Sequence, residues 1–256
     1  ITEVGTSNTE VWTFSVLRAG IDHFSDSAAN WLKANFLTWQ PTVKPVTYYT
    51  PEFLTYYAVV DSVVRCRAYV DKNGEYASYD LTLANLSNGS VWTIPVQYAI
   101  ISGKLNKLPS YYDVWVETKT GTRLTYLQRY YATDIRSEQE QWVLFENSLG
   151  GIDTFRAYGD SENTAKHTHN IAEIENEAEE YRVDTTREYK KNTGFLSEGE
   201  RRLLLDFFPS LGKYLYIDSY IRRIVVTESD ASWQTKELPS SYTFTYKYAD
   251  ARPYLN

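Results

Sequence analysis

Turn signals between runs of strand-forming residues constrain the fold of this chain more than any other feature. Asn73-Gly74 separates two runs of alternating apolar and polar side chains, at residues 63–70 and 76–84. An Asn-Gly pair between such runs predicts a tight hairpin, because both residues tolerate positive φ. Similar runs recur about every ten residues through the first half, a spacing typical of an antiparallel β-sandwich.

The same patterns predict the other elements of the first half. A short helix is expected at residues 27–36. The proline-rich stretch 39–51 should form a sheet edge or a linker, because proline cannot donate a hydrogen bond to a strand ladder. Further strands are expected at residues 11–17, 91–101, 112–117 and 123–131.

A shift toward charged residues at 133–141 suggests a domain boundary. We therefore expect a mainly β chain of two domains. Residues 1–133 should form an antiparallel β-sandwich, and residues 134–256 an α+β domain with an antiparallel sheet and one or two helices. Strands of the second domain are expected at residues 142–146, 214–217, 223–227 and 242–248.

One helix of the second domain has clear boundaries. Ser197-Glu-Gly-Glu200 has the pattern of a capping box, in which the serine and the glutamate each satisfy a backbone amide of the first turn. Pro209 prevents the helix from continuing. The sequence therefore predicts a helix that starts after Ser197 and ends before Pro209.

A polar segment precedes this helix. We expect residues 159–170 to form an exposed loop and the acid-rich run 171–181 to form a solvated helical face or a mobile arm. His167 and His169 would share one face of a strand, but no third ligand accompanies them. We therefore expect no metal site.

Charge and hydropathy disfavour several classes of partner, although a local basic patch stays open. The formal net charge is -7, whereas proteins that grip nucleic acid are usually basic, so neither nucleic acid nor an anionic membrane surface is an expected partner. No run reaches the roughly 18 apolar residues that a membrane helix needs.

Cys66 is the only cysteine, and its apolar neighbours predict a buried thiol. The sequence contains no Met, so we expect a processed or trimmed chain.

Motifs for catalysis and cofactor binding are missing from the sequence. There is no Gly-x-Ser-x-Gly elbow, no phosphate-binding Gly-x-x-x-x-Gly-Lys loop and no Gly-x-Gly-x-x-Gly dinucleotide motif. The 33 acidic residues form too many pairs to select one for glycoside hydrolysis. We expect no catalytic residue, no cofactor and no enzymatic activity.

The only Gly-Gly pair in the chain lies between two expected strands. Gly150 and Gly151 should supply positive φ where the chain reverses, and Asp153 should close the turn with its side chain. A phosphate cradle would require a helix after the glycines, but a strand is expected there. If the domain assembles, Asp153 and Arg156 are candidates for polar contacts between subunits.

Aromatic residues are unusually abundant, at 16% of the chain. Exposed rings on a β-sandwich could form a platform that stacks against sugars, and the candidates are Trp39, Tyr49, Tyr57, Tyr112 and Trp115. The alternative interpretation is that these rings belong to the core or to a subunit interface, because tyrosine and tryptophan are favoured in both.

Several sequence blocks resemble a family of conserved, mostly uncharacterised proteins of Bacteroidetes phages and prophages that are associated with the virion tail. The resembling blocks lie at residues 35–41, 145–159, 192–196, 205–210 and 239–246. The resemblance implies a structural role in a tail or baseplate, self-assembly into a ring, and contacts with other tail proteins. It also implies assembly in a bacterial cytoplasm and a final location in the virion. It transfers no catalytic residue.

We interpret the chain as a non-enzymatic structural component of a phage tail or related particle, assembled through aromatic-rich β surfaces. The alternative is a secreted or cell-surface carbohydrate-binding module, and a third interpretation is a glycan-active enzyme. Size in solution separates the first two. A ring or a concentration-dependent oligomer favours assembly, whereas a monomer that binds a glycan array favours the module.

Overall fold

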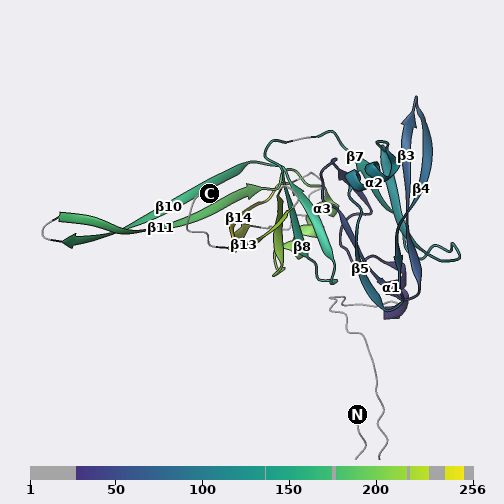
Figure 1. Cartoon of the computed structure of the whole chain (residues 1–256), viewed down its shortest axis with the longest axis horizontal. Helices are drawn as coiled ribbons and strands as arrows, with labels where there is room; N and C mark the ends of the chain where they lie inside the picture. The colour runs from purple at the N-terminus through teal and green to yellow at the C-terminus, as the bar shows by residue number, and fades with distance from the viewer. Residues whose placement is uncertain (1–26, 136, 175–176, 218–219, 231–239, 251–256) are drawn as a thin grey trace, which may run out of the picture.

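The computed structural model describes residues 27–135, 137–174, 177–217, 220–230 and 240–250, shown in Figure 1. The strand expected at residues 11–17 lies outside this part of the chain. Strands dominate the described residues, which also contain three helices. The predicted class is confirmed: the chain is mainly β, with a β-sandwich followed by an α+β domain whose sheet is antiparallel.

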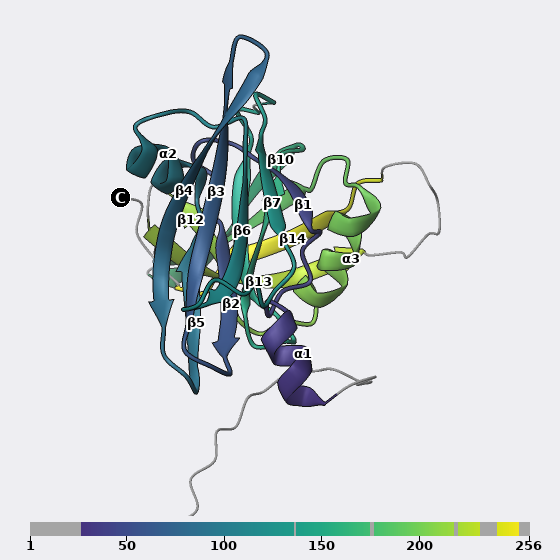
Figure 2. The same ribbon diagram turned by 90° about the vertical axis from the view of Figure 1, so that its right-hand side faces the viewer.

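The first domain is a sandwich of two sheets. The larger sheet has the strand order β1-β7-β6-β3-β4 and is antiparallel except for the β1–β7 pair. The smaller sheet pairs β2 with β5 (Figure 2). The strands are β1 (Val43–Val46), β2 (Phe53–Ala58), β3 (Ser62–Lys72), β4 (Glu75–Leu86), β5 (Ser90–Pro95), β6 (Tyr111–Thr118) and β7 (Gln128–Ala132).

Alternating side chains explain how the two sheets pack. Val64, Cys66 and Ala68 of β3 are fully buried, whereas Arg65 and Arg67 point to the opposite face. The buried residues form one core with side chains of β2, β5 and β6. Cys66 is a buried thiol, as predicted, and burial raises its pKa to about 12.

Two local predictions in this domain are confirmed. Asn73 and Gly74 adopt φ of 59° and 93° and join β3 to β4 in a tight hairpin. The expected first helix is α1 (Ala28–Ala34), where the Ser27 hydroxyl accepts a hydrogen bond from the Asn30 amide at 3.2 Å. Both features depend only on neighbouring residues.

The strand expected at residues 91–101 is wrong in its second half. β5 ends at Pro95, and helix α2 (Tyr98–Leu105) follows. Tyr98 and Ile101 are buried at helical spacing, and Asn106 ends the helix in the left-handed conformation. A run of apolar residues fits a buried strand or a buried helix equally well, so burial on one helical face decided the outcome.

The second domain is built on a seven-stranded antiparallel sheet. Its strand order is β10-β11-β14-β13-β12-β8-β9. The strands are β8 (Gln141–Glu146), β9 (Ile152–Ala157), β10 (Ser161–Ile174), β11 (Glu177–Asn192), β12 (Lys213–Ile217), β13 (Tyr220–Asp230) and β14 (Thr243–Tyr248). The four strands expected in this domain are thus present.

Helix α3 (Glu198–Phe207) covers one face of this sheet (Figure 2). The capping box is confirmed, because Ser197 and Glu200 each accept from the backbone amide of the other. Phe207 lies 4.8 Å from Phe155 and 5.5 Å from Phe244 between ring centroids. These edge-on ring contacts form the centre of the second core.

The loop and the helix expected within residues 159–181 are wrong, whereas the expected solvent exposure is confirmed. The polar stretch and the acid-rich run form strands β10 and β11, which pair over most of their length. The sequence shows no strand periodicity here because both faces of this hairpin are exposed away from its base, so no apolar residues are required at alternate positions. Figure 1 shows this hairpin projecting far from the rest of the molecule.

Each domain has its own core. The first core draws on residues from Phe36 to Tyr130, and the second on residues from Val143 to Tyr246. The boundary expected between residues 133 and 134 lies in the segment that separates these cores and stays a prediction.

Candidate functional site

The Gly-Gly turn connects β8 to β9, as predicted. Gly150 has a φ of +84°, which glycine adopts without strain. The side chain that closes the turn is Asn147 rather than Asp153: its Oδ1 accepts from the amides of Leu149 at 3.0 Å and Gly151 at 2.8 Å. The expected turn is confirmed, and the residue expected to close it is wrong.

Gly151 is required for close approach rather than for positive φ. A Cβ atom at this position would lie 2.1 Å from the carbonyl oxygen of Leu37, in the first domain. Asn147 Nδ2 donates to the same oxygen at 2.9 Å. The turn is therefore part of the junction between the two domains.

Asp153 lies inside this junction. Only 1% of the residue is exposed, and its carboxylate accepts hydrogen bonds from the Thr38 hydroxyl, from the Trp39 amide at 3.1 Å and from Asn147 Nδ2 at 2.9 Å. Burial raises the pKa of Asp153, although these donors lower it. An interior carboxylate offers no surface to a second subunit, so the expectation of a subunit contact at Asp153 is wrong.

A buried ion pair lies in the same junction. Lys44 Nζ is 2.7 Å from Glu52 Oε1 and donates to the carbonyl oxygen of Thr154 at 2.5 Å and to Gln40 Oε1 at 3.2 Å. Burial raises the pKa of Glu52 to about 7, because the loss of water outweighs the attraction of Lys44. Lys44 therefore joins the first domain to strand β9. No sequence motif marks this pair, since isolated charges in a proline-rich stretch usually indicate a solvated loop.

Arg156 is already occupied within the chain. Its Nε donates to Glu140 Oε2 at 2.7 Å, its Nη2 donates to the carbonyl oxygen of Ile135 at 2.6 Å, and its guanidinium lies 5.3 Å from the Tyr158 ring centroid. These contacts fix the segment before β8 against β9. A subunit contact through Arg156 stays a prediction.

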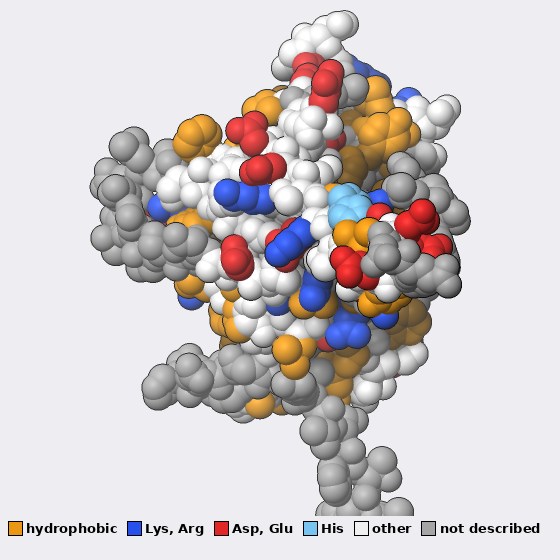
Figure 3. Space-filling view, turned by 90° about the vertical axis from the view of Figure 1, so that its left-hand side faces the viewer, with side chains coloured by type: hydrophobic (Ala, Val, Ile, Leu, Met, Phe, Trp, Pro, Cys, Tyr) orange, Lys and Arg blue, Asp and Glu red, His pale blue; other side chains and the backbone are white. Residues whose placement is uncertain are grey.

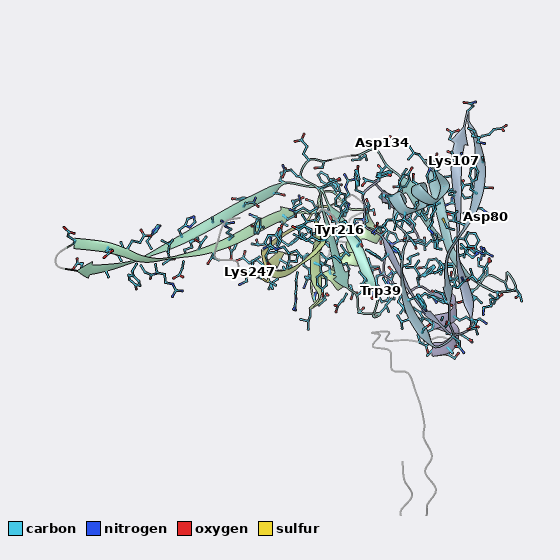
Figure 4. The ribbon with its side chains drawn as sticks, viewed as in Figure 1. Trp39, Asp80, Lys107, Asp134, Tyr216 and Lys247 are labelled. Carbon is cyan, nitrogen blue, oxygen red and sulfur yellow. The ribbon has the colours of Figure 1, made fainter. Side chains whose placement is uncertain are left out.

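The five aromatic candidates are not brought together. No ring contact joins any two of them, and all five lie within the described residues. Tyr112 is fully buried, stacks on Tyr130 at 5.2 Å and donates to the carbonyl oxygen of Val96, so its place on an exposed platform is wrong. Trp39 lies at the domain junction (Figure 4), where its Nε1 donates to Ser148 Oγ at 2.9 Å.

The remaining three candidates lie apart on the first domain. Tyr49 is exposed on a loop and contacts Tyr48, and Tyr57 is half-buried on β2. Trp115 is on the outer face of the five-stranded sheet, in a shallow groove of about 380 Å³ that Tyr69 and Arg123 also line. Trp115 therefore lines a hollow of the surface.

Tyr69 and Asp113, which line the groove beside Trp115, are held by neighbouring side chains of the same sheet face. Tyr69 stacks on Tyr111 at 4.3 Å, and the Arg129 guanidinium lies 4.6 Å from the Tyr111 centroid. Arg129 also donates twice to Asp113, at 2.6 and 2.7 Å. This arrangement is a cross-strand ladder of the kind that stabilises a solvated sheet face. Sequence reasoning missed Tyr69, which alternation along β3 could have placed on this face.

Within the described chain, the hairpin of β10 and β11 pairs with the rest of the sheet only at its base. Its base is fixed: β11 pairs with β14 from Tyr189 to Asn192, and buried Lys191 donates to the carbonyl oxygen of Gly159 at 2.7 Å and to Ser161 Oγ at 2.9 Å. Between Tyr189 and the turn of the hairpin, neither strand pairs with any third strand of the described chain. We call residues 164–174 and 177–188 the outer hairpin.

Side chains of the outer hairpin are exposed on both faces. Tyr181 is 68% exposed, and Ile171 and Val183 are exposed as well. His167 and His169 share one face and hydrogen-bond across the hairpin to Thr185 and Glu180. Among the described residues, no three His, Cys, Asp or Glu side chains are grouped to hold a metal ion. No helix in the same part of the chain is both long and apolar enough to span a membrane.

Comparison with known proteins gives little. No protein-family model and no curated protein matches the sequence. Among solved structures, a chain of the phage p2 baseplate in its activated conformation with Sr is similar at 15% identity and a TM-score of 0.29. The similarity covers 43% of this chain and 44% of that chain. At this TM-score we base no argument on the likeness.

Proposed function

We propose that this protein is a non-enzymatic structural component of a phage tail or baseplate, and that it forms a homo-oligomer through the outer hairpin. The observation that carries the proposal is the exposure of this hairpin on both faces. A two-stranded hairpin alone in water is marginally stable at best, because it buries too little apolar surface. We therefore expect a long hairpin with exposed Tyr181, Ile171 and Val183 to bury these side chains against a partner surface.

The free edge of β10 supports the same proposal. β10 is the outermost strand of the seven-stranded sheet, so one row of its amides and carbonyls faces outward. Such edges pair readily with another chain. The resemblance of the sequence to tail-associated proteins of Bacteroidetes phages supports a virion setting, with other tail proteins as further partners.

Shortening the hairpin tests the proposal. In the test variant, a two-residue Asn-Gly turn replaces residues 164–188 and links Asn163 to Tyr189. These two residues are paired in the native hairpin, so the anchored base is kept. Sedimentation velocity over a concentration series should show a wild-type oligomer and a monomeric variant. Circular dichroism and the melting temperature control for folding of the two domains.

Two results would count against the proposal. A wild-type chain that stays monomeric at every concentration would contradict it, and binding of that monomer to a glycan array would favour the carbohydrate-binding alternative. An oligomer that forms equally well without the outer hairpin would show that another surface drives assembly.

A further inference from the structure

The tip of the outer hairpin is acidic. Residues 171–174 and 177–181 contain four glutamates, Glu173, Glu177, Glu179 and Glu180, and no Lys or Arg. Within the described chain, Glu173, Glu177 and Glu179 make no ion pair, and Glu180 pairs with His169. Figure 3, which looks toward the hairpin end-on, shows acidic side chains gathered there beside exposed hydrophobic ones. The tip thus combines negative charge with the exposed rings and chains of Tyr181 and Ile171.

A groove of about 480 Å³ on the same domain has the complementary character. It lies where β13 begins and β14 ends, and it is lined by Tyr220, Ile221, Arg222, Arg223, Ala249 and Asp250. Tyr220 and Ile221 are exposed apolar side chains, whose burial would favour binding. Tyrosine and arginine are also the residues most enriched at binding hot spots.

The two arginines of this groove differ in their partners. Arg222 donates to both carboxylate oxygens of Asp250, at 3.1 and 3.2 Å, and lies 3.4 Å from the Tyr248 ring centroid. Arg223 is exposed and makes no ion pair with any described residue. Among the described residues, an acid therefore offsets the charge of Arg222 but not that of Arg223.

The tip cannot reach the groove of its own chain. The 11 residues of β10 from Thr164 to Ile174 extend for about 36 Å at the usual rise of a strand. Figure 1 shows this extension directed away from β13 and β14, whose ends form the groove. A contact between tip and groove must therefore join two copies of the chain.

We propose that the tip of the outer hairpin of one copy docks in the Tyr220–Arg223 groove of a second copy. Glutamates of the tip meet Arg223, and Tyr181 or Ile171 packs on Tyr220 and Ile221. The two surfaces differ, so the contact is head-to-tail and repeats along a closed ring or an open filament. This inference rests on the proposed function and assigns the surface that receives the hairpin.

Charge reversal on each surface tests the inference. Glu179→Lys and Arg223→Glu should each weaken association at least tenfold in sedimentation velocity, because each places like charges together. The double variant should regain most of the wild-type association. Mixing the two single variants should also restore assembly, since opposite charges again meet at every contact in an alternating oligomer. Arg123→Glu, which reverses another exposed arginine without an ion pair in the described chain, is the matched control and should assemble normally.

The outcomes separate this inference from the proposed function. If the shortened hairpin abolishes assembly but Arg223→Glu assembles like wild type, the groove is not the receiving surface and the proposed function stands. If both single variants fail but neither the double variant nor the mixture recovers, tip and groove do not meet, and the inference is overturned. A monomeric wild type would overturn both.

Discussion

Gly151 shows at the scale of one residue why the two domains can meet closely. Its φ is not in the left-handed region, and the turn itself needs only Gly150. What it lacks is room, because a Cβ atom would lie 2.1 Å from Leu37 O and 3.1 Å from Thr55 Cβ. Backbone on both sides must move before any side chain fits.

Gly151→Ala should therefore destabilise the protein by about 1–3 kcal/mol, the usual effect of overpacking. The measurement is the free energy of unfolding in denaturant. Gly103→Ala is the control, because Gly103 lies in helix α2 with open space around its Cβ position. Alanine there should raise stability by up to about 1 kcal/mol. Equal stability of Gly151→Ala and wild type would contradict the close-approach role.

Single residues around the Gly-Gly turn differ in how far their roles could be predicted from the sequence. The Gly-Gly pair predicted a turn correctly, because a turn depends on local backbone preferences. The contacts of Asn147 and Asp153 with the first domain were not predictable, since their partners Leu37 and Thr38 are more than 100 residues earlier in the chain. An acid beside a turn looks the same in sequence whether it faces water or a second domain.

At the scale of elements, predictability followed local signals. Helix α3 was predicted with its first residue, because the capping box is a short pattern. Strands β3 and β6, which alternate between buried and more exposed side chains, were predicted from this alternation. β10 and β11 were missed, because hydrogen bonding between them and not burial defines them. Helix α2 was missed because an apolar run does not distinguish a buried helix from a strand.

Hydrogen exchange should divide the hairpin into two parts. Amides that pair β10 with β11 between residues 164 and 188 should exchange much faster than those near Lys191, because opening the outer part exposes no core. On assembly, the outer amides should become protected while the base changes little. Mass spectrometry at concentrations below and above the association threshold measures both. Slow exchange along the whole hairpin in the monomer would contradict this expectation.

At the scale of the whole molecule, the domain junction is sensitive to pH. The pKa of Glu52 is raised from 4.5 to about 7, so the folded protein holds a proton there more tightly than the unfolded chain. Stability from this group is complete below about pH 4.5 and is lost as the pH rises to about 7. The pKa of Asp153 is raised as well, so this second carboxylate acts in the same direction.

Glu52→Gln should flatten this pH dependence. Between pH 5 and pH 8, Glu52 should cost the wild type up to about 3 kcal/mol of unfolding free energy. The variant should have an unfolding free energy similar to that of the wild type near pH 5, because glutamine is similar to the protonated acid. Its unfolding free energy should fall less than that of the wild type between pH 5 and pH 8. Glu75→Gln, at an exposed position, should behave like wild type. Denaturant unfolding at both pH values measures this. An equal change in unfolding free energy between pH 5 and pH 8 for wild type and Glu52→Gln would contradict the role of Glu52.

The outer hairpin projects from a base that the hydrogen bonds of Lys191 hold in place. Any rotation about this base, its pivot, is therefore magnified at the tip. For an arm of about 36 Å, each degree of rotation at the pivot moves the tip by about 0.6 Å. In the proposed head-to-tail assembly, a small rotation at the pivot would therefore shift the tip relative to the Tyr220–Arg223 groove of the next copy. Arm length and pivot stiffness together would set how many subunits complete one turn, and shortening the arm by pairs of residues should change that number before it abolishes assembly.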